Sequence, residues 1–332
     1  MTDSYLSAVS VQLPPAVTVF EDVASAPEWR AVSQYPGGTP VEMAVEVGIP
    51  AVNRSGIDSA QFDWLIHTGS GYQGARSWPV HHAVQAAVLG SNGNAIEVRQ
   101  FCAGGLTSWT LADSMRRPDR AVVCTAADNW SWTDRFALSR HDAGEPFADV
   151  ASAAVIGPSG FAQILSTGNA SCPDHADAWR SDDQFWEHMT QKGFRDAYVN
   201  AIGSRAPSTM RASTRMIATA LRLALADAGL DPADVTCFVP PSSRTGEPYR
   251  LLASRMGLPW MDELYQFHLD HGYLSVSAQA AGLGHLARLG LLDDGATVLL
   301  VATEYNLSAT AVVVRIVRRP ELSIEDRVVT VH

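Results

Sequence analysis

The sequence predicts an α/β fold made of two similar halves, in each of which helices cover a mostly parallel sheet. Apolar runs of strand length alternate with stretches whose apolar residues recur at helical spacing, as expected for a sheet buried on both faces. Two pairs of segments also repeat in the same order along the chain. Finally, 332 residues exceed the usual size of one hydrophobic core, and 46% hydrophobic with 18% charged residues excludes a disordered chain.

The repeat is clearest between residues 56–66 (GIDSAQFDWLI) and residues 229–239 (GLDPADVTCFV). Each copy predicts a helix closed by glycine, a turn nucleated by aspartate, and then a buried strand. The apolar run at 120–126 resembles the run at 296–302 in the same way. Both pairs are separated by roughly 175 residues. We infer that the second half duplicates the first.

Helices are predicted between these strands from apolar residues at helical spacing. Residues 168–208 interrupt the alternation, because they are polar and tryptophan-containing, and we interpret them as an insertion or cap. The predicted division is therefore an N-terminal half over 1–167, the insertion over 168–208, and a C-terminal half over 209–332. The predicted helices span 80–89, 104–115, 214–228, 249–256 and 278–289.

Charge and cysteine content exclude several classes of function. The chain has 24 Lys and Arg against 35 Asp and Glu, a net charge of −11, so nucleic acid is not an expected partner. No apolar run is long enough to span a membrane, and the first residues do not form a signal peptide, so a cytoplasmic protein is expected. The four cysteines are far apart and form no CxxC motif, which predicts reduced thiols.

The segment 95–106 (AIEVRQFCAGGL) contains the main candidate for chemistry. It predicts a strand that leads to Cys102 and a helix that begins near Gly104. A thiol at a helix start is expected to have a lowered pKa, and glycines there are expected to let a thioester approach the backbone. Cys102 is thus a candidate nucleophile that forms an acyl-enzyme. The alternative is a buried structural cysteine beside a tight turn.

The residues from Gln100 to Gly105 resemble the nucleophile turn of ketoacyl synthase III enzymes. Segments 11–14, 56–68, 147–155 and 302–316 resemble further parts of that family. The resemblance implies the thiolase fold, with two βαβαβαββ halves in a five-layered αβαβα arrangement and a homodimer as the usual assembly. It also implies an acyl-CoA or acyl carrier protein donor. No metal or redox cofactor is implied, and coenzyme A or phosphopantetheine enters as part of the donor.

The chain departs from the family where a His and an Asn normally assist the cysteine. By resemblance, Pro241 occupies the His position, Arg244 the Asn of that run, and Tyr273 the other Asn. Without these groups, the enolate of a Claisen condensation loses its stabilisation. A subgroup of starter-unit and acyl-transfer enzymes from natural-product pathways instead has a His and an Asp, but Tyr273 and Ala278 occupy those positions here.

A substitute base is predicted in the segment 268–271 (HLDH). If this segment is extended, His271 and Tyr273 lie on one face, so that His271 reaches the thiol. Asp270 or His268 would then orient the His271 ring. The alternative is that His271 has no catalytic role.

The resemblance also implies the remaining site residues. The backbone amides at Cys102 and Asn306 would form the oxyanion hole, with Glu304, Tyr305 and Asn306 replacing a Gly-Gly-Gly turn. Trp78 occupies the place of an aromatic residue that closes the partner subunit's acyl pocket. Substrate contacts are expected from Trp78, Tyr273, Arg244 and Tyr305. Arg135 or Arg140 is a candidate for contacting a donor phosphate.

The sequence therefore favours an acyltransferase of secondary metabolism that moves an acyl group through Cys102 to a small hydroxyl or amine acceptor. One alternative is a starter-unit ketosynthase that performs decarboxylative condensation. A second alternative, from another class, is a non-catalytic partner subunit with the same fold. The presence of a thiol at position 102 argues against the second alternative.

Overall fold

The computed structural model describes residues 3–18, 29–75, 77–133, 135, 146–179, 207–242, 246–304, 307–325 and 327–332. Its first half alternates strands and helices and ends in two consecutive strands. The elements, in order, are β1 (Ser4–Gln12), α1 (Pro40–Ser55), β4 (Phe62–Thr68), α2 (Val80–Val88), β5 (Asn94–Val98), α3 (Gly104–Met115), β6 (Ala121–Asp128) and β7 (Val150–Gly157). A short two-stranded sheet, β2 (Ala16–Thr18) with β3 (Ala31–Ser33), is separate from this series.

The second half repeats this order, with one substitution. No strand corresponding to β5 is described between α7 and α9, where helix α8 lies instead. The elements are β8 (Ala162–Ser171), α6 (Pro207–Ala228), β9 (Cys237–Val239), α7 (Glu247–Met256), α8 (Asp262–His271), α9 (Ala278–Arg288), β10 (Thr297–Glu304) and β11 (Ser308–Ile316). The hairpin β12 (Leu322–Glu325) and β13 (Val328–Val331) returns to pair with β1.

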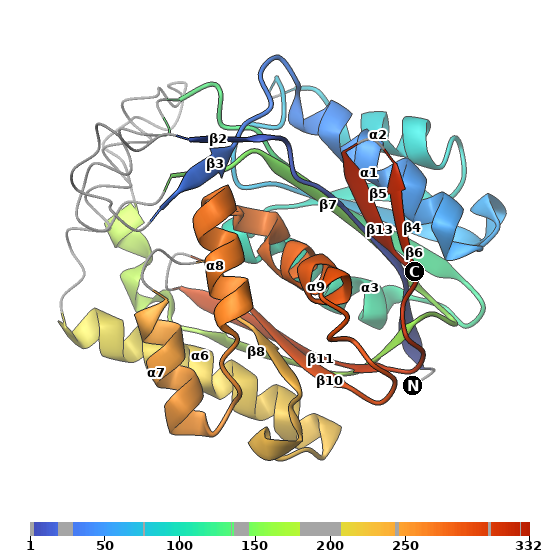
Figure 1. Ribbon diagram of the computed structural model, residues 1–332. Helices are drawn as coiled ribbons and strands as arrows, with labels where there is room; N and C mark the ends of the chain where they lie inside the picture. Colours follow the sequence, from blue (N-terminus) through green and yellow to red (C-terminus); the bar gives the residue numbers. More distant parts are fainter. Residues whose placement is uncertain are drawn as a thin grey trace.

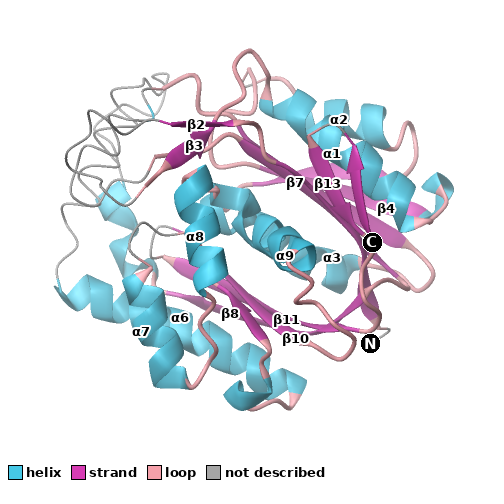
Figure 2. Cartoon of the chain, in the orientation of Figure 1, coloured by secondary structure: helices cyan, strands magenta, loops and turns pink. Residues whose placement is uncertain are grey.

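The halves form five layers (Figures 1 and 2). Helices α3 and α9 lie between two groups of strands, while α1 and α2 cover one group from outside and α6 and α7 cover the other. The strand order is β5-β4-β6-β7-β1-β8-β11-β10-β9, and β1 joins the groups by pairing with both β7 and β8. The thiolase arrangement predicted from the sequence is therefore confirmed.

The expectation of a mostly parallel sheet is wrong. Strands β4, β5 and β6 pair in parallel, as do β9 and β10. However, β7 pairs antiparallel with β6, and β11 pairs antiparallel with β10. Each half thus ends in two consecutive antiparallel strands, which make the sheet mixed.

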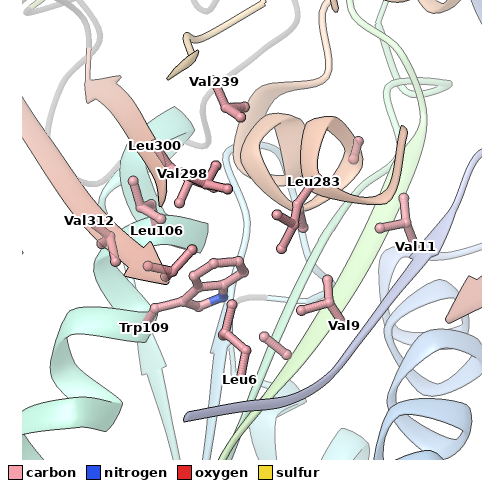
Figure 3. Close-up of a cluster of buried hydrophobic side chains, with 14 of the residues drawn as sticks. Leu6, Val9, Val11, Leu106, Trp109, Val239, Leu283, Val298, Leu300 and Val312 are labelled. Atoms are coloured by element: carbon pink, nitrogen blue, oxygen red, sulfur yellow. The ribbon is translucent and has the colours of Figure 1, made fainter. Parts of the chain in front are cut away.

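The space between the two groups of strands is filled by apolar side chains from both halves (Figure 3). Leu6 and Trp109 come from the first half, and Leu283, Val298 and Val312 from the second, and all belong to one buried cluster. Because α3 and α9 are covered on both sides, their positions relative to each other are determined by this packing. The active-site candidates lie where these two helices begin.

The predicted duplication is confirmed in detail. Gly56 ends α1 with a φ of 69°, and Gly229 follows α6 with a φ of 66°. Asp58 and Asp231 then cap the short helices η1 (Ser59–Gln61) and η4 (Pro232–Asp234), which lead into β4 and β9. The same local signals therefore produce the same backbone twice.

The predicted helices are present with small differences at their ends. Helix α3 has the predicted bounds, while α6 begins at Pro207, earlier than the predicted start at residue 214. The predicted boundary at 167/168 falls inside β8, which continues to Ser171. Of the predicted insertion, the short helix η3 (Pro173–Trp179) is described, and residues 180–206 lie outside the described ranges.

Candidate active site

Cys102 lies in a single turn of 3-10 helix, η2 (Phe101–Ala103), between β5 and α3. This is the predicted order of strand, cysteine and helix. Phe101 has a φ of 42°, an unfavourable conformation for a residue with a Cβ atom. The thiol residue is 8% exposed, and all four cysteines of the chain are free.

The two glycines after Cys102 are explained by packing. A Cβ atom at Gly104 would overlap the side chain of Thr68 at the end of β4. A Cβ atom at Gly105 would overlap the backbone carbonyl of Val276, in the short helix η5 (Ser275–Ser277). The glycines thus let the start of α3 approach η5 closely, and the predicted approach of a thioester is not needed to explain them.

This close approach surrounds the thiol with hydroxyl groups. The Ser275 hydroxyl lies 3.7 Å from Cys102 Sγ and the Ser70 hydroxyl 3.8 Å, while the two hydroxyl oxygens are 2.8 Å apart. The Tyr273 hydroxyl also hydrogen-bonds the thiol. The structure therefore places Tyr273, one of the predicted site residues, beside Cys102. It also places there two serines, Ser70 and Ser275, that the sequence analysis missed.

Burial raises the pKa of the Cys102 thiol above its ordinary value, which contradicts the predicted lowering. Hydrogen bonds from the hydroxyls of Tyr273, Ser275 and Ser70 act in the opposite direction, and the nearby charge of Asp128 raises the pKa further. Desolvation exceeds the effect of the hydroxyl donors because the charged thiolate loses its hydration in this interior position. The Cys102 thiol is therefore protonated at neutral pH.

Asp128, the last residue of β6, is the acidic group beside this cluster. Its side chain is buried, and its Oδ1 atom accepts hydrogen bonds of 2.8 Å from the backbone amides of Ser70 and Gly71. Burial raises the pKa of Asp128 to about 6. A signal for this residue was present in the sequence, since Ser70 and Asp128 both follow or end buried parallel strands whose carboxyl ends meet at one edge.

The predicted extended segment around His271 is wrong. His271 is the last residue of helix α8, and Gly272, with a φ of 85°, turns the chain after it. His271 Nδ1 lies 3.0 Å from the Ser33 hydroxyl, and burial lowers the pKa of His271 to about 4. Its proposed orienting group, Asp270, pairs instead with Arg30 at the surface.

The neighbours of the His271 ring thus differ from those of the Cys102 thiol. No hydrogen bond joins it to Cys102 in the described part of the chain, and its ring packs 4.7 Å from the Phe267 ring. His268, the other proposed orienting group, is buried with its pKa lowered to about 3 by burial. The base predicted from the sequence is therefore not supported by this geometry.

The remaining predicted residues have varied surroundings. Trp78 is 44% exposed, and its ring lies over Gly74. Arg135 is buried and forms an ion pair of 2.9 Å with Asp149, so it is not available to a donor phosphate. The other predicted positions, Arg244, Tyr305, Asn306 and Arg140, lie outside the described residues.

None of the helices in the described ranges combines the length and apolar character that crossing a membrane requires. No group of three or more His, Cys, Asp or Glu side chains in those ranges is arranged to hold a metal ion.

Comparison with known proteins agrees with the fold. Residues 225–316 match the family model described as 3-oxoacyl-[acyl-carrier-protein (ACP)] synthase III C terminal. A β-ketoacyl-[acyl-carrier-protein] synthase III of Rhodobacter capsulatus is 23% identical over 290 residues, covering 84% of this chain and 85% of the relative. The mycobacterial enzyme of Mycobacterium tuberculosis is 27% identical over 282 residues, covering 82% and 80%.

Solved structures are similar over almost the whole chain. The acyltransferase ChlB3 aligns with a TM-score of 0.82 at 22% identity, covering 95% of this chain and 98% of the other. The priming β-ketosynthase of the R1128 polyketide pathway aligns with a TM-score of 0.74 at 21% identity, covering 96% and 98%. At these identities the structural likeness establishes the thiolase fold. Together with the sequence relatives and the matching family model, it shows that the chain is similar to ketoacyl synthase III enzymes.

Proposed function

We propose that this chain is an acyltransferase of secondary metabolism. Cys102 would accept an acyl group from acyl-CoA or an acyl carrier protein and pass it to a small hydroxyl or amine acceptor. The observation that supports this most strongly is a buried thiol at the start of α3, surrounded by hydroxyl donors from two other segments. In the first step the sulfur of Cys102 attacks the thioester carbonyl, and the donor thiol leaves.

The changes around Cys102 favour transfer over condensation. Pro241, at the position of the family's histidine, is buried and offers neither a proton donor nor a base. Tyr273, at the position of an asparagine, directs its hydroxyl to the thiol. Both reactions need an oxyanion hole and proton transfer, but only the decarboxylation of a malonyl thioester also needs donors that stabilise an enolate.

The partners that we propose follow from this chemistry and from the family. Coenzyme A or phosphopantetheine would enter as part of the donor, with no metal or redox cofactor. Strand β5 lies at one end of the strand order, and no described strand pairs with its outer edge, which could therefore pair with a second copy. We therefore propose a homodimer, which light scattering on the purified protein would test by giving twice the mass of one chain. We also propose that the protein is cytoplasmic.

The first experiment is intact-mass spectrometry after incubation with a panel of acyl-CoAs and acyl carrier proteins. We expect one acyl adduct on the native protein and none on Cys102→Ala. Cys172→Ala is the matched control, because Cys172 is the more exposed of the free thiols and should not be acylated. If no donor in the panel forms an adduct, the non-catalytic alternative is favoured.

A second experiment distinguishes transfer from condensation. The isolated acyl-enzyme is mixed with small alcohols, amines or a malonyl carrier protein, and loss of the adduct is followed by mass. Discharge by an alcohol or amine supports the proposed function. Discharge by the malonyl carrier with release of carbon dioxide would support a starter-unit ketosynthase instead.

A further inference from the structure

We propose that Asp128 accepts the proton of Cys102 through the hydroxyl groups of Ser70 and Ser275, and so replaces the base that the family takes from histidine. This inference rests on the proposed acyl transfer for its biological role. Ser70 and Ser275, which touch the sulfur, would be catalytic residues, and Asp128 would act through them. The substrate that would bind beside Cys102 and these residues is the thioester donor that we proposed above.

The first observation is the continuity of the cluster. The hydroxyls of Ser70 and Ser275 each contact Cys102 Sγ and contact each other at 2.8 Å. Asp128 accepts the backbone amide of Ser70, and the Ser275 hydroxyl is close enough to Asp128 to lower its pKa. The thiol, the Ser275 hydroxyl and the carboxylate are therefore neighbours, and the proposed proton transfer runs through the Ser275 hydroxyl.

The second observation is that the structural role of Asp128 uses only one of its oxygen atoms. Oδ1 holds the turn after β4 by accepting the amides of Ser70 and Gly71. Oδ2 is buried, and none of the described residues forms a hydrogen bond with it. A buried acceptor without a partner is costly, and such groups are often retained for function.

The chemistry balances without any added reagent. As the sulfur–carbon bond forms, the thiol proton moves to the Ser275 hydroxyl oxygen, and the proton of that hydroxyl moves to Asp128. When the tetrahedral intermediate collapses, the bond to the donor sulfur breaks, and the proton returns through the hydroxyl to that sulfur. In the second step the same path takes a proton from the acceptor hydroxyl or amine and returns it to Cys102.

The ionisable groups around Asp128 are compatible with this role. Cys102 lies across the two serines and is protonated at rest, and the Tyr273 hydroxyl faces the same thiol. Asp149 on the neighbouring segment raises the pKa of Asp128, but its own charge is paired with Arg135. With a pKa of about 6, Asp128 is mostly ionised at neutral pH and able to accept a proton.

The test uses iodoacetamide on the full-length protein, with alkylation of Cys102 followed by intact mass from pH 5 to pH 9. This probe requires no acyl donor, so it can fail or succeed independently of the proposed function. For the native protein we expect the rate to rise around pH 6, as Asp128 ionises, and then to stay level to about pH 8.5. In Asp128→Asn, the side-chain oxygen can still accept hydrogen bonds from both backbone amides, but the side chain cannot accept a proton.

For Asp128→Asn we expect no rise near pH 6 and a rate that increases about tenfold per pH unit above neutrality, because only the thiolate then reacts. At pH 7 we expect about a 100-fold loss, as for other general bases. Ser70→Ala combined with Ser275→Ala should give the same profile. Identical profiles for the native protein and Asp128→Asn would overturn the proposal.

A matched control is available in the same region. Ser152 and Ser277 form a buried hydroxyl pair at 2.9 Å that does not touch Cys102. Ser277→Ala removes a buried hydroxyl from η5, as Ser275→Ala does, but should leave the alkylation profile unchanged. If Ser277→Ala changes the profile as much as the Ser70 and Ser275 changes do, the effect is a loss of packing and the proposal is wrong.

Discussion

The turn that begins α3 and the turn that begins α9 are two versions of one backbone. Each is a three-residue 3-10 helix that leads directly into a central helix, η2 before α3 and η5 before α9. The first residue of each has the same unusual conformation, a φ of 42° at Phe101 and 43° at Ser275. The duplication thus extends to the strained residue beside Cys102.

The side chains of the two turns differ. The first presents Cys102, and at the equivalent place the second has Val276, whose carbonyl faces Gly105. After the turn, the first half has two glycines and the second has Ala278 and Gln279. The comparison teaches that one half of the duplicated fold supplies the Cys102 thiol, while the other supplies a hydroxyl group and a close surface against it.

Among changes that test the contact between the two turns, Gly105→Ala is expected to have the largest effect on stability. The added Cβ atom would overlap the Val276 carbonyl, so the two turns must separate, with a loss of about 3 kcal/mol in the free energy of unfolding. Thermal and urea unfolding measure this loss. The control is Gly284→Ala in α9, where the nearest atom is 3.8 Å away, and a gain of about 0.5 kcal/mol is expected. Equal effects of the two changes would refute the packing role of Gly105.

A smaller effect on stability is expected at the start of β4, where the side-chain contacts differ from those before the equivalent strand β9. Asp63 in β4 pairs with Arg117 and Arg120, whereas the equivalent Thr236 before β9 uses its hydroxyl to accept the amide of Thr297. We expect Asp63→Asn to reduce the free energy of unfolding by about 1 kcal/mol at pH 7, since the arginines are partly exposed.

The pH dependence of this effect has a defined sign. The arginines lower the pKa of Asp63 in the folded state. The stabilisation is therefore fully present above the ordinary aspartate pKa and is lost as the pH falls through the lower folded-state value. Urea unfolding of the native protein and Asp63→Asn between pH 7 and pH 2 should show their difference shrinking only at the acidic end. A difference that is constant over this range would contradict the ion-pair explanation.

The smallest effect on stability is expected from Ser275→Gly. Glycine adopts a positive φ readily, so the variant should gain up to about 1 kcal/mol of stability. At the same time it loses a hydroxyl next to Cys102, and alkylation of the thiol at pH 7 should slow. Phe101→Gly, the equivalent change in the first turn, keeps that hydroxyl. If Ser275→Gly leaves the alkylation rate as high as in the native protein, Ser275 is only a structural residue.

Local patterns in the sequence predicted much of this protein. Gly56 and Gly229 marked helix ends, Asp58 and Asp231 marked turns, and the bounds of α3 were predicted without error. These features depend on residues close together in the chain. The failure at His271 has the same origin, because the segment was assumed to be extended when its own residues, up to the glycine at 272, form a helix.

The sequence alone therefore determined the duplicated architecture and the choice of Cys102 as the candidate nucleophile, since both depend on short-range patterns and on one thiol at a strand–helix turn. Only the tertiary structure decided what surrounds that thiol. Ser275 lies 173 residues from Cys102 and meets it because α3 and α9 are packed between the two groups of strands. Burial in that packing also decided the direction of the thiol's pKa, because desolvation depends on every segment that excludes water from the sulfur.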